Sequence, residues 1–553
     1  MLPLLDFSED ILRLVVSHVD SQRDFAALAR SCKALHRLCD MNARRRYRRI
    51  RLCSSADLER ALYILLSILR KPQLRDYVRH IELDSNTLWN DTLARDHQRH
   101  KKPLTDEDKR LLQRATEAAR FPKVMEEHVF YLLKVVAEGS KASPLPPSHK
   151  DRDDVDRNIG DALCAVLITV CPRLQSMATT CLMCTPSISD RKEDSGEDFM
   201  HSRMPTELIL RRSGARPSEY PFARNLRDIT IIPHGRGWAS THGYPKVDIW
   251  SSLRPIMGLP AIDSVTMNAA KCPEWMTTIE PADQSSNIRR LRLPNANLDF
   301  RILNRAIKSC KVLTEFILTA GGGERWNRPS FAPLPMTHAL LKHVRTLEVL
   351  HLDIDAYVPS NWYWQESDDY RLCDDVGWDD ELEQEIWDNS HEAEESLAED
   401  GDHIAGEPWP LNLRDAGVQS WSPGLADFTK LTHLRIGIDA FFFLARGVAW
   451  STKPKYKQIY DYDGDFIQSK RLPIPADSWT LVGSIPQSLQ SLQITGYQKG
   501  QRSEYDEHVR ALLAERESQL PNLKEIEGLD QPMPAATKVV SNPAPEVWSE
   551  YED

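Results

Sequence analysis

The sequence predicts a mixed α/β protein in which a short helical module, residues 1–43, precedes a long body of repeated helix, turn and strand units, residues 44–530. Two observations predict this class. Apolar residues recur at helical spacing near the N-terminus, and an apolar hexad of the form L-x-x-L-x-L recurs through the body. Segments without the hexad interrupt the body at about 90–158, 185–222, 356–427 and 446–478, and we expect them to be insertions.

The first helix is expected to begin at Ser8, whose side chain can accept a hydrogen bond from a free backbone N–H of the first turn. Glu9 and Asp10 follow, in the turn where the helix dipole favours negative charge. Two apolar stripes come next, separated by the polar segment 20–23, and two short helices cannot bury all of this surface between themselves. The stripes comprise Ile11, Leu12, Val15, Val16 and Val19, and then Phe25, Leu28, Ala29, Cys32 and Leu35.

This N-terminal pattern resembles an F-box, a helical module that binds the Skp-family adaptor of a cullin–RING ubiquitin ligase. The usual Leu-Pro opening of the module is replaced here by Phe7-Ser8. The resemblance implies that the chain binds the adaptor, and through it a cullin, by Leu5, Phe7, Ile11, Leu12, Val15, Val16, Leu28, Cys32 and Leu35. The alternative is an ordinary helical hairpin that caps the body.

The hexad occurs eight times in the body, with apolar residues at its first, fourth and sixth positions. Its alternating last three positions predict a short strand with one buried face. The hexads begin at Val78, Leu226, Ile262, Ile288, Leu313, Leu347, Leu431 and Leu489, and incomplete copies begin at Leu174 and Leu523.

Several hexads follow a short helical stretch and a turn rich in Cys, Pro or Ser, as at 159–174, 300–313 and 507–523. A repeated helix, turn and strand resembles the leucine-rich repeat, which implies an irregular α/β solenoid with a parallel sheet. The clearest spacings are 26 residues, from Ile262 to Ile288, and 25 residues, from Ile288 to Leu313. The asparagine that follows the hexad in that family is missing, and chance hexads in any leucine-rich α/β protein are the alternative.

An F-box followed by such repeats implies a substrate-recognition subunit of a Skp–cullin–F-box ubiquitin ligase, in the style of the fungal F-box proteins. Alternate strand positions point away from the core, so they would form the face that binds an unknown protein substrate. The residues expected on that face include Thr230, Thr266, Arg292, His351, Arg435 and Gln493. The alternative function is a leucine-rich-repeat scaffold for protein–protein interaction outside any ligase.

Composition favours a cytoplasmic or nuclear protein without a membrane span. Ten cysteines are scattered, no secretory leader pattern opens the chain, and the longest apolar runs are too short to cross a bilayer. The net charge of −11 is local: residues 366–402 hold 17 Asp and Glu against Arg371 alone, a net of −16 that leaves +5 for the rest. The segment 356–427 also holds six of the 14 tryptophans, so we expect part of it to pack or bind, whereas the acidic, Pro-rich tail 531–553 is expected to be disordered.

Other patterns favour no catalytic, cofactor or metal site. The basic run Arg44–Arg51 fits a half-buried first strand at Ile50 and Leu52 better than a nuclear signal or nucleic-acid contact. Cys181-x-x-Cys184, with Cys164 and Cys171 upstream, lacks the spacing of a four-ligand zinc site. Gly321–Gly323 lacks the Gly-Lys-Ser/Thr of a phosphate loop. We therefore expect no enzyme, although an enzyme using the tryptophan-rich segment is the third alternative.

Overall fold

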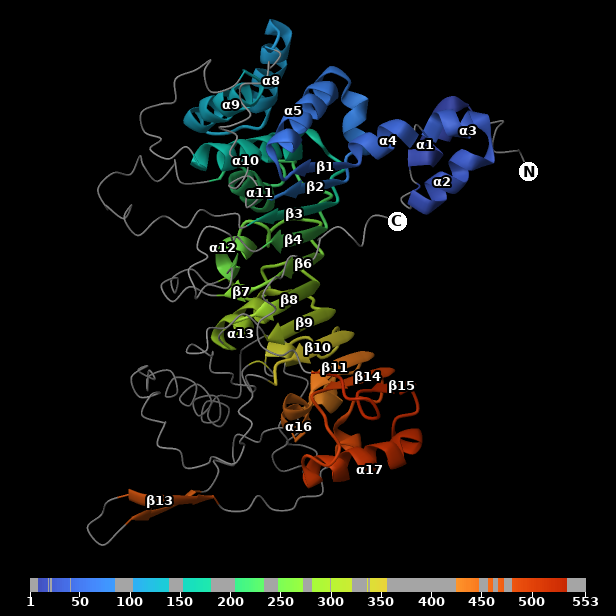
Figure 1. Cartoon of the computed structure of the whole chain (residues 1–553), viewed down its shortest axis with the longest axis vertical. Coiled ribbons are helices and arrows are strands. Elements are labelled where there is room, and N and C mark those ends of the chain that lie inside the picture. The colour runs from blue at the N-terminus through green and yellow to red at the C-terminus, as the bar shows by residue number, and fades with distance from the viewer. Residues whose placement is uncertain are drawn as a thin grey trace, which may run out of the picture.

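The computed structural model carries one large sheet, with most of its helices on one side of the strands and a small helical module set apart near the N-terminus (Figure 1). The structure describes residues 8–17, 19, 22–39, 41–84, 103–138, 153–180, 204–232, 247–271, 281–298, 300–320, 336, 339–355, 424–446, 456–460, 466–471 and 480–534.

The large sheet has eleven parallel strands, and each of them pairs with the sheet strands that come before and after it in the chain. Two short strand pairs lie outside this sheet. This confirms the predicted mixed α/β class. The strands are β1 (Arg49–Leu52), β2 (His80–Leu83), β3 (Ser176–Thr180), β4 (Asp228–Ile232), β6 (Ser264–Met267), β8 (Arg290–Ala296), β9 (Glu315–Ala320), β10 (Val349–Asp353), β11 (His433–Gly437), β14 (Ser491–Thr495) and β15 (Glu525–Glu527).

Every hexad found in the sequence, incomplete copies included, ends in one of these strands. Its apolar positions point into the core because successive strand residues alternate between the two faces. In β10, for example, Leu347, Leu350 and Leu352 are completely buried. Strand β1 follows the same rule with Ile50 and Leu52, both buried, so its half-buried character was predicted correctly.

The helices of the body connect successive strands and cover the apolar face. Their bounds fit local signals: Ser54 accepts a hydrogen bond from Asp57 N–H at the start of α5, and Thr105 and Asp108 cap α8 reciprocally. They are α5 (Ser55–Arg70), α8 (Asp106–Ala118), α9 (Lys123–Glu138), α10 (Asp153–Val170), α11 (Pro205–Ala215), α12 (Ile249–Leu253), α13 (Phe300–Ser309), α16 (Ile438–Arg446) and α17 (Ser503–Gln519), with 3₁₀ turns η2 (Pro72–Tyr77), η8 (Leu425–Asp427) and η9 (Val482–Ser484).

Two of the expected insertions contain regular helices of the body. The range 90–158 holds α8, α9 and the start of α10, and the range 185–222 holds α11. Helix α11 begins with Pro205 in its first turn and buries Leu208, Ile209 and Leu210. The range 446–478 carries the antiparallel pair β12 (Tyr456–Tyr460) and β13 (Phe466–Arg471), and β5 (Val247–Asp248) pairs with β7 (Ala270–Lys271) elsewhere.

The N-terminal module consists of α1 (Glu9–Ser17), α2 (Gln22–Ser31) and α3 (Lys33–Cys39). Val16, Ala29 and Cys39 form its own small core, separate from the core of the sheet. Helix α4 (Met41–Tyr47) leads from the module to the sheet, and its Tyr47 is buried in the core of the sheet (Figure 1). The expected boundary at residue 43 therefore falls inside α4, and Arg44, Arg45 and Arg46 lie in a helix rather than in a strand.

Several expectations fall on residues outside the described ranges. They concern the C-x-x-C pair at Cys181, the glycines 321–323, the tail 535–553, and the acidic segment up to residue 423. Within the part of the chain that the structure describes, no helix is both long and apolar enough to cross a bilayer.

Candidate functional site

The face of the sheet opposite the hexad side chains is the first candidate for binding. We call it the strand face and define it by two rows of residues that the parallel register aligns. The first row is Arg49, His80, Ser176, Asp228, Ser264, Arg290, Glu315, Val349, His433, Ser491 and Glu525. The second row is Arg51, Glu82, Ala178, Thr230, Thr266, Arg292, Ile317, His351, Arg435, Gln493 and Glu527.

All six residues predicted for the substrate face lie in the second row, and each is half-buried. The register brings Thr230, Thr266 and Arg292 together on β4, β6 and β8, and His351, Arg435 and Gln493 together on β10, β11 and β14. Ile317 of β9 separates the two groups. Sequence reasoning did not select Ile317, although aligning the hexads with one another gives the register that puts it there.

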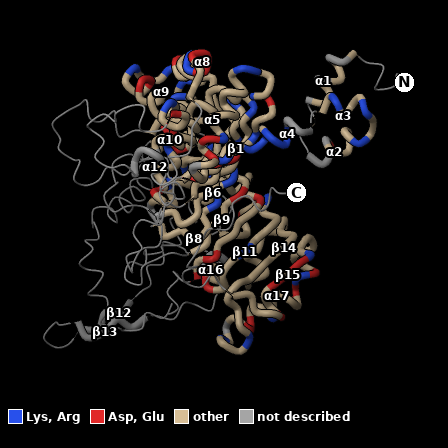
Figure 2. The backbone as a smooth tube through the Cα atoms, turned by 45° about the horizontal axis from the view of Figure 1, so that its top comes forward, with Lys and Arg blue, Asp and Glu red and all other residues tan. Residues whose placement is uncertain are grey.

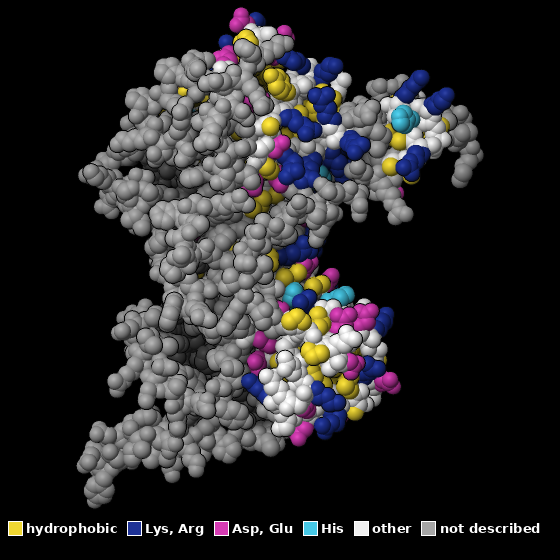
Figure 3. Space-filling model, in the orientation of Figure 1, with side chains coloured by type: hydrophobic (Ala, Val, Ile, Leu, Met, Phe, Trp, Pro, Cys, Tyr) yellow, Lys and Arg dark blue, Asp and Glu magenta, His cyan; other side chains and the backbone are white. Residues whose placement is uncertain are grey.

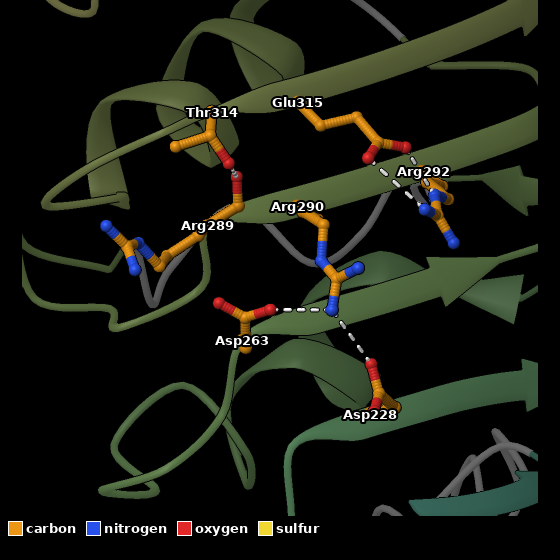
Figure 4. A network of polar contacts seen from close by, with 7 residues as sticks. All are labelled: Asp228, Asp263, Arg289, Arg290, Arg292, Thr314 and Glu315. Atoms are coloured by element: carbon orange, nitrogen blue, oxygen red, sulfur yellow. Dashed lines mark hydrogen bonds and ion pairs between the residues drawn. The ribbon is translucent and has the colours of Figure 1, made fainter. Parts of the chain in front are cut away.

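Ion pairs satisfy most of the arginines of the strand face. Arg290 lies 2.6 Å from Asp263 and 3.3 Å from Asp228, and Arg292 donates two hydrogen bonds of 2.5 and 3.2 Å to Glu315 (Figure 4). Burial raises the pKa of Asp228, and Arg290 opposes that rise. These pairs fix the arginine side chains across the four neighbouring strands from β4 to β9.

At the β1 end, the buried carboxylate of Glu82 accepts from two arginines, Arg49 at 3.0 Å and Arg51 at 3.1 Å. His80 shares a hydrogen bond of 2.5 Å with Ser176 on the next strand. Burial lowers the pKa of His80 to about 4, and the positive charges of Arg48, Arg79 and Arg49 add to the effect, so this imidazole is neutral at physiological pH.

Near β10 and β11 the strand face has a different character. His351 and Arg435 are direct neighbours in the second row. His351 Nε2 and Arg435 Nε are both buried, and neither has a hydrogen-bond partner among the described residues. Burial lowers the pKa of His351 to about 4, with a smaller contribution from the charge of Arg435.

Charge is spread along the molecule rather than confined to one end. Figure 2 shows Lys and Arg along the backbone near α4 and β1, and acidic residues among others near α17. On the side that is hollowed between the N-terminal helices and the β14–β15 end, Figure 3 shows Lys, Arg and His side chains interleaved with hydrophobic ones. Such a mixed surface suits a protein partner better than a uniformly basic stripe suits nucleic acid.

The second candidate surface is the outer side of α1. Of the residues predicted to bind the adaptor, Ile11 and Val15 are exposed by 45% and 40%, and Leu14, which the prediction omitted, is exposed by 59%. Leu12, Val16 and Leu35 are buried inside the module, and Leu28 and Cys32 are half-buried. Leu5 and Phe7 lie outside the described residues. The exposed apolar surface is therefore made by Ile11, Leu14 and Val15.

Among the described residues, no group of three or more His, Cys, Asp or Glu is placed to hold a metal ion. Burial raises the pKa of the Cys53, Cys171 and Cys310 thiols to about 12, which disfavours the nucleophilic thiolate.

A scan against models of protein families finds no match for this chain, and a search of curated proteins finds none that is significantly similar.

Proposed function

We propose that this chain is the substrate-recognition subunit of a Skp–cullin–F-box ubiquitin ligase. In this proposal α1–α3 are an F-box that binds the Skp-family adaptor, the eleven-stranded sheet is a divergent leucine-rich-repeat-like solenoid, and the strand face binds the target protein. The chain itself carries out no chemistry.

The observation that carries the proposal is the apolar surface of Ile11, Leu14 and Val15 on a module with its own core. Three large apolar side chains on one short helix are exposed while that core contains only three fully buried residues. Each side chain is about half exposed, so burying the rest against a partner is worth roughly half of the 1.5–3 kcal/mol of a fully exposed side chain, which still contributes to docking after the cost of association. A helical module that presents apolar residues outward fits a docking element.

The strand face supports the second half of the proposal. Its two rows hold mostly polar and charged residues in register, with apolar members such as Ala178, Ile317 and Val349. Glu82, Ser176, Ala178 and Ser264 are buried, so a partner would contact the remaining positions. A rigid, mostly polar face with a few apolar anchors has the composition of a protein interface. Holding a target there would place one of its lysines near a ubiquitin-conjugating enzyme, which accelerates transfer by raising the effective concentration.

The test is a pull-down of the purified chain with the Skp-family adaptor. We compare the wild type with the double variant Ile11→Asp/Val15→Asp, which places charge on the exposed surface and leaves the buried Leu12 and Val16 untouched. The matched control is Val124→Asp on α9, because Val124 is 60% exposed and lies on the body.

The expected result is adaptor binding by the wild type and by Val124→Asp, and its loss in the double variant. No binding by the folded wild type would reject the ligase function and leave a scaffold for protein–protein interaction as the remaining proposal. Equal binding by all three proteins would reject the assignment of α1 as the docking helix.

A further inference from the structure

The arginines of the strand face differ in whether a carboxylate satisfies them. The two rows contain five arginines, and four of them pair with acidic residues: Arg49 and Arg51 with Glu82, Arg290 with Asp228 and Asp263, and Arg292 with Glu315. Arg435 alone has no carboxylate partner among the described residues, and Gln493 separates it from Glu527, the next acidic member of its row. Arg435 is thus the exception among the five arginines, and its neighbour in the row is exceptional as well.

That second exception is His351, the neighbour of Arg435 on β10. A buried nitrogen without a partner costs about 1–3 kcal/mol, and here two such atoms, His351 Nε2 and Arg435 Nε, lie on adjacent strands of one face. The sheet fixes both backbones, so a shift of the strands cannot bring the two nitrogens to other hydrogen-bond partners. Two neighbouring residues of one row that each leave a buried nitrogen unsatisfied, and that are themselves only half-buried, are the arrangement expected of a site that an external group completes.

The chemistry of the missing group follows from these donors. Arg435 offers N–H donors and a permanent positive charge, which a carboxylate matches best. His351 is neutral at physiological pH because burial and Arg435 lower its pKa to about 4, so the pair carries a single positive charge. One carboxylate balances that charge, whereas a phosphate dianion would leave an excess of negative charge at a half-buried site.

We propose that His351 and Arg435 bind a carboxylate side chain in an acidic segment of the partner protein. This inference rests on the proposed function, in which the strand face binds the target. Ile317 and Val349 lie beside His351 in the two rows and provide apolar contacts for residues that flank the acidic one. Gln493 lies on the other side of Arg435 and provides an amide for the backbone of the segment.

The experiment uses the full chain and a positional-scanning library of labelled decapeptides, in which each position is fixed in turn as Glu, Gln, phosphoserine or Ser. Three proteins are compared: wild type, Arg435→Gln, and Arg216→Gln. Arg216→Gln is the matched control because it removes the same charge at an exposed arginine that lies outside the strand face and is paired with Glu219. Arg435→Lys is a further variant that keeps the charge but loses the planar donor group.

We expect the wild type to prefer Glu over Gln by about tenfold or more at one or two positions, as the loss of a charge-assisted hydrogen bond implies. That preference should disappear in Arg435→Gln, fall in Arg435→Lys, and persist within about threefold in Arg216→Gln. Thermal melting of each variant confirms that the fold is kept.

Three outcomes would overturn the inference. They are no preference for Glu in the wild type, an equal loss in Arg435→Gln and Arg216→Gln, and a stronger preference for phosphoserine than for Glu at the selected position. None of these three outcomes affects the adaptor pull-down. If the chain binds the adaptor but does not select acidic peptides, the proposed function stands and the carboxylate site is rejected.

Discussion

The N-terminal module and the sheet body differ in how completely they bury their apolar side chains. The body buries the apolar residues of every hexad in one continuous core and leaves a mostly polar face outward. The module has a small core of Val16, Ala29 and Cys39, and Leu12 and Leu35 are buried beside it. It leaves Ile11, Leu14 and Val15 exposed. The described part of the body exposes large apolar side chains only singly, as at Val124 and Leu513, whereas the module groups three of them on one helix, where a partner can bury them.

The difference teaches how a chain can separate two kinds of recognition. An apolar surface on a small module binds by desolvation, which is strong but unspecific. A polar face held by a rigid sheet binds through hydrogen bonds and charges, which discriminate between partners. Each surface can change without disturbing the other because their cores are separate.

The largest expected effect concerns the two faces of a single strand of the body. Phe316 is completely buried, and Phe316→Ala should lower the free energy of unfolding by about 3–5 kcal/mol. Its neighbour Ile317 lies on the strand face, so Ile317→Ala should cost less than about 1.5 kcal/mol. Denaturant unfolding of the two variants measures both values, and equal losses would contradict the assignment of faces.

The second effect probes a tight contact at the end of β11. A Cβ atom on Gly437 would overlap the carboxylate of Asp355, which accepts hydrogen bonds from the N–H groups of Asp439 and Ala440 at 3.4 and 3.2 Å. Because that carboxylate caps α16, it cannot move away freely, and Gly437→Ala should cost about 1–3 kcal/mol.

The control for this variant is Gly483→Ala, whose new atom would approach the Thr480 hydroxyl at 3.1 Å. A side-chain hydroxyl can shift by a few tenths of an ångström, so the control should lose much less stability. Similar losses in thermal or denaturant unfolding would show that Asp355 yields more readily than the capping contacts imply.

The third effect is a pH dependence confined to the body. Burial raises the pKa of Asp355 to about 7, and the charges of Asp439 and Asp353 add to the rise. Since the folded-state pKa lies above the unfolded value near 3.8, this group contributes stability that is fully present below about 3.8 and is lost as the pH rises through about 7.

Asp355→Asn removes this titration and keeps one of the two hydrogen bonds, because its single amide oxygen replaces only one of the two carboxylate oxygens that accept them. The stability of the variant relative to the wild type should therefore rise as the pH increases from 5 to 8, by about 1–2 kcal/mol. Melting temperatures of both proteins across that range give the difference. A difference that does not change with pH would mean that Asp355 remains ionised throughout.

The smallest expected effect tests whether the N-terminal module and the body are independent of each other. A chain that begins at Met41 keeps α4, whose Arg44 lies over the Tyr77 ring and whose Tyr47 is buried in the core of the sheet. Removing the module should change the melting temperature of the body by no more than about 2 °C, which corresponds to about 1 kcal/mol for a body of this size. A large fall would show that the module caps the body rather than serving as an independent element.

Much of the fold could be predicted because it depends on local periodicity. The hexads predicted the strands, and the helical stretches expected before the hexads at Leu313 and Leu523 correspond to α13 and α17. Helix α11 was not selected, because its first turn follows a long polar segment and its apolar residues Leu208, Ile209 and Leu210 are consecutive, so they show no helical stripe.

The candidate sites were predictable only in part. Alternation placed His351 and Arg435 on the strand face, but their lack of partners depends on which acidic residues reach them across strands. In the same way, the apolar stripe of α1 was visible in the sequence, whereas the division into buried Leu12 and exposed Leu14 depends on how α2 and α3 pack against it.

The sheet joins each strand directly to its successor, and this bears on how such a chain can acquire length. Strands β10 and β11 are hydrogen-bonded neighbours although roughly 80 residues separate Asp353 from His433. The entropy lost on closing a connecting loop grows only with the logarithm of its length, by about 0.6 kcal/mol for each doubling. A crossover between adjacent strands can thus accept a long segment for about the stability of one weak hydrogen bond, and the register of His351 beside Arg435 is kept whatever that segment contains.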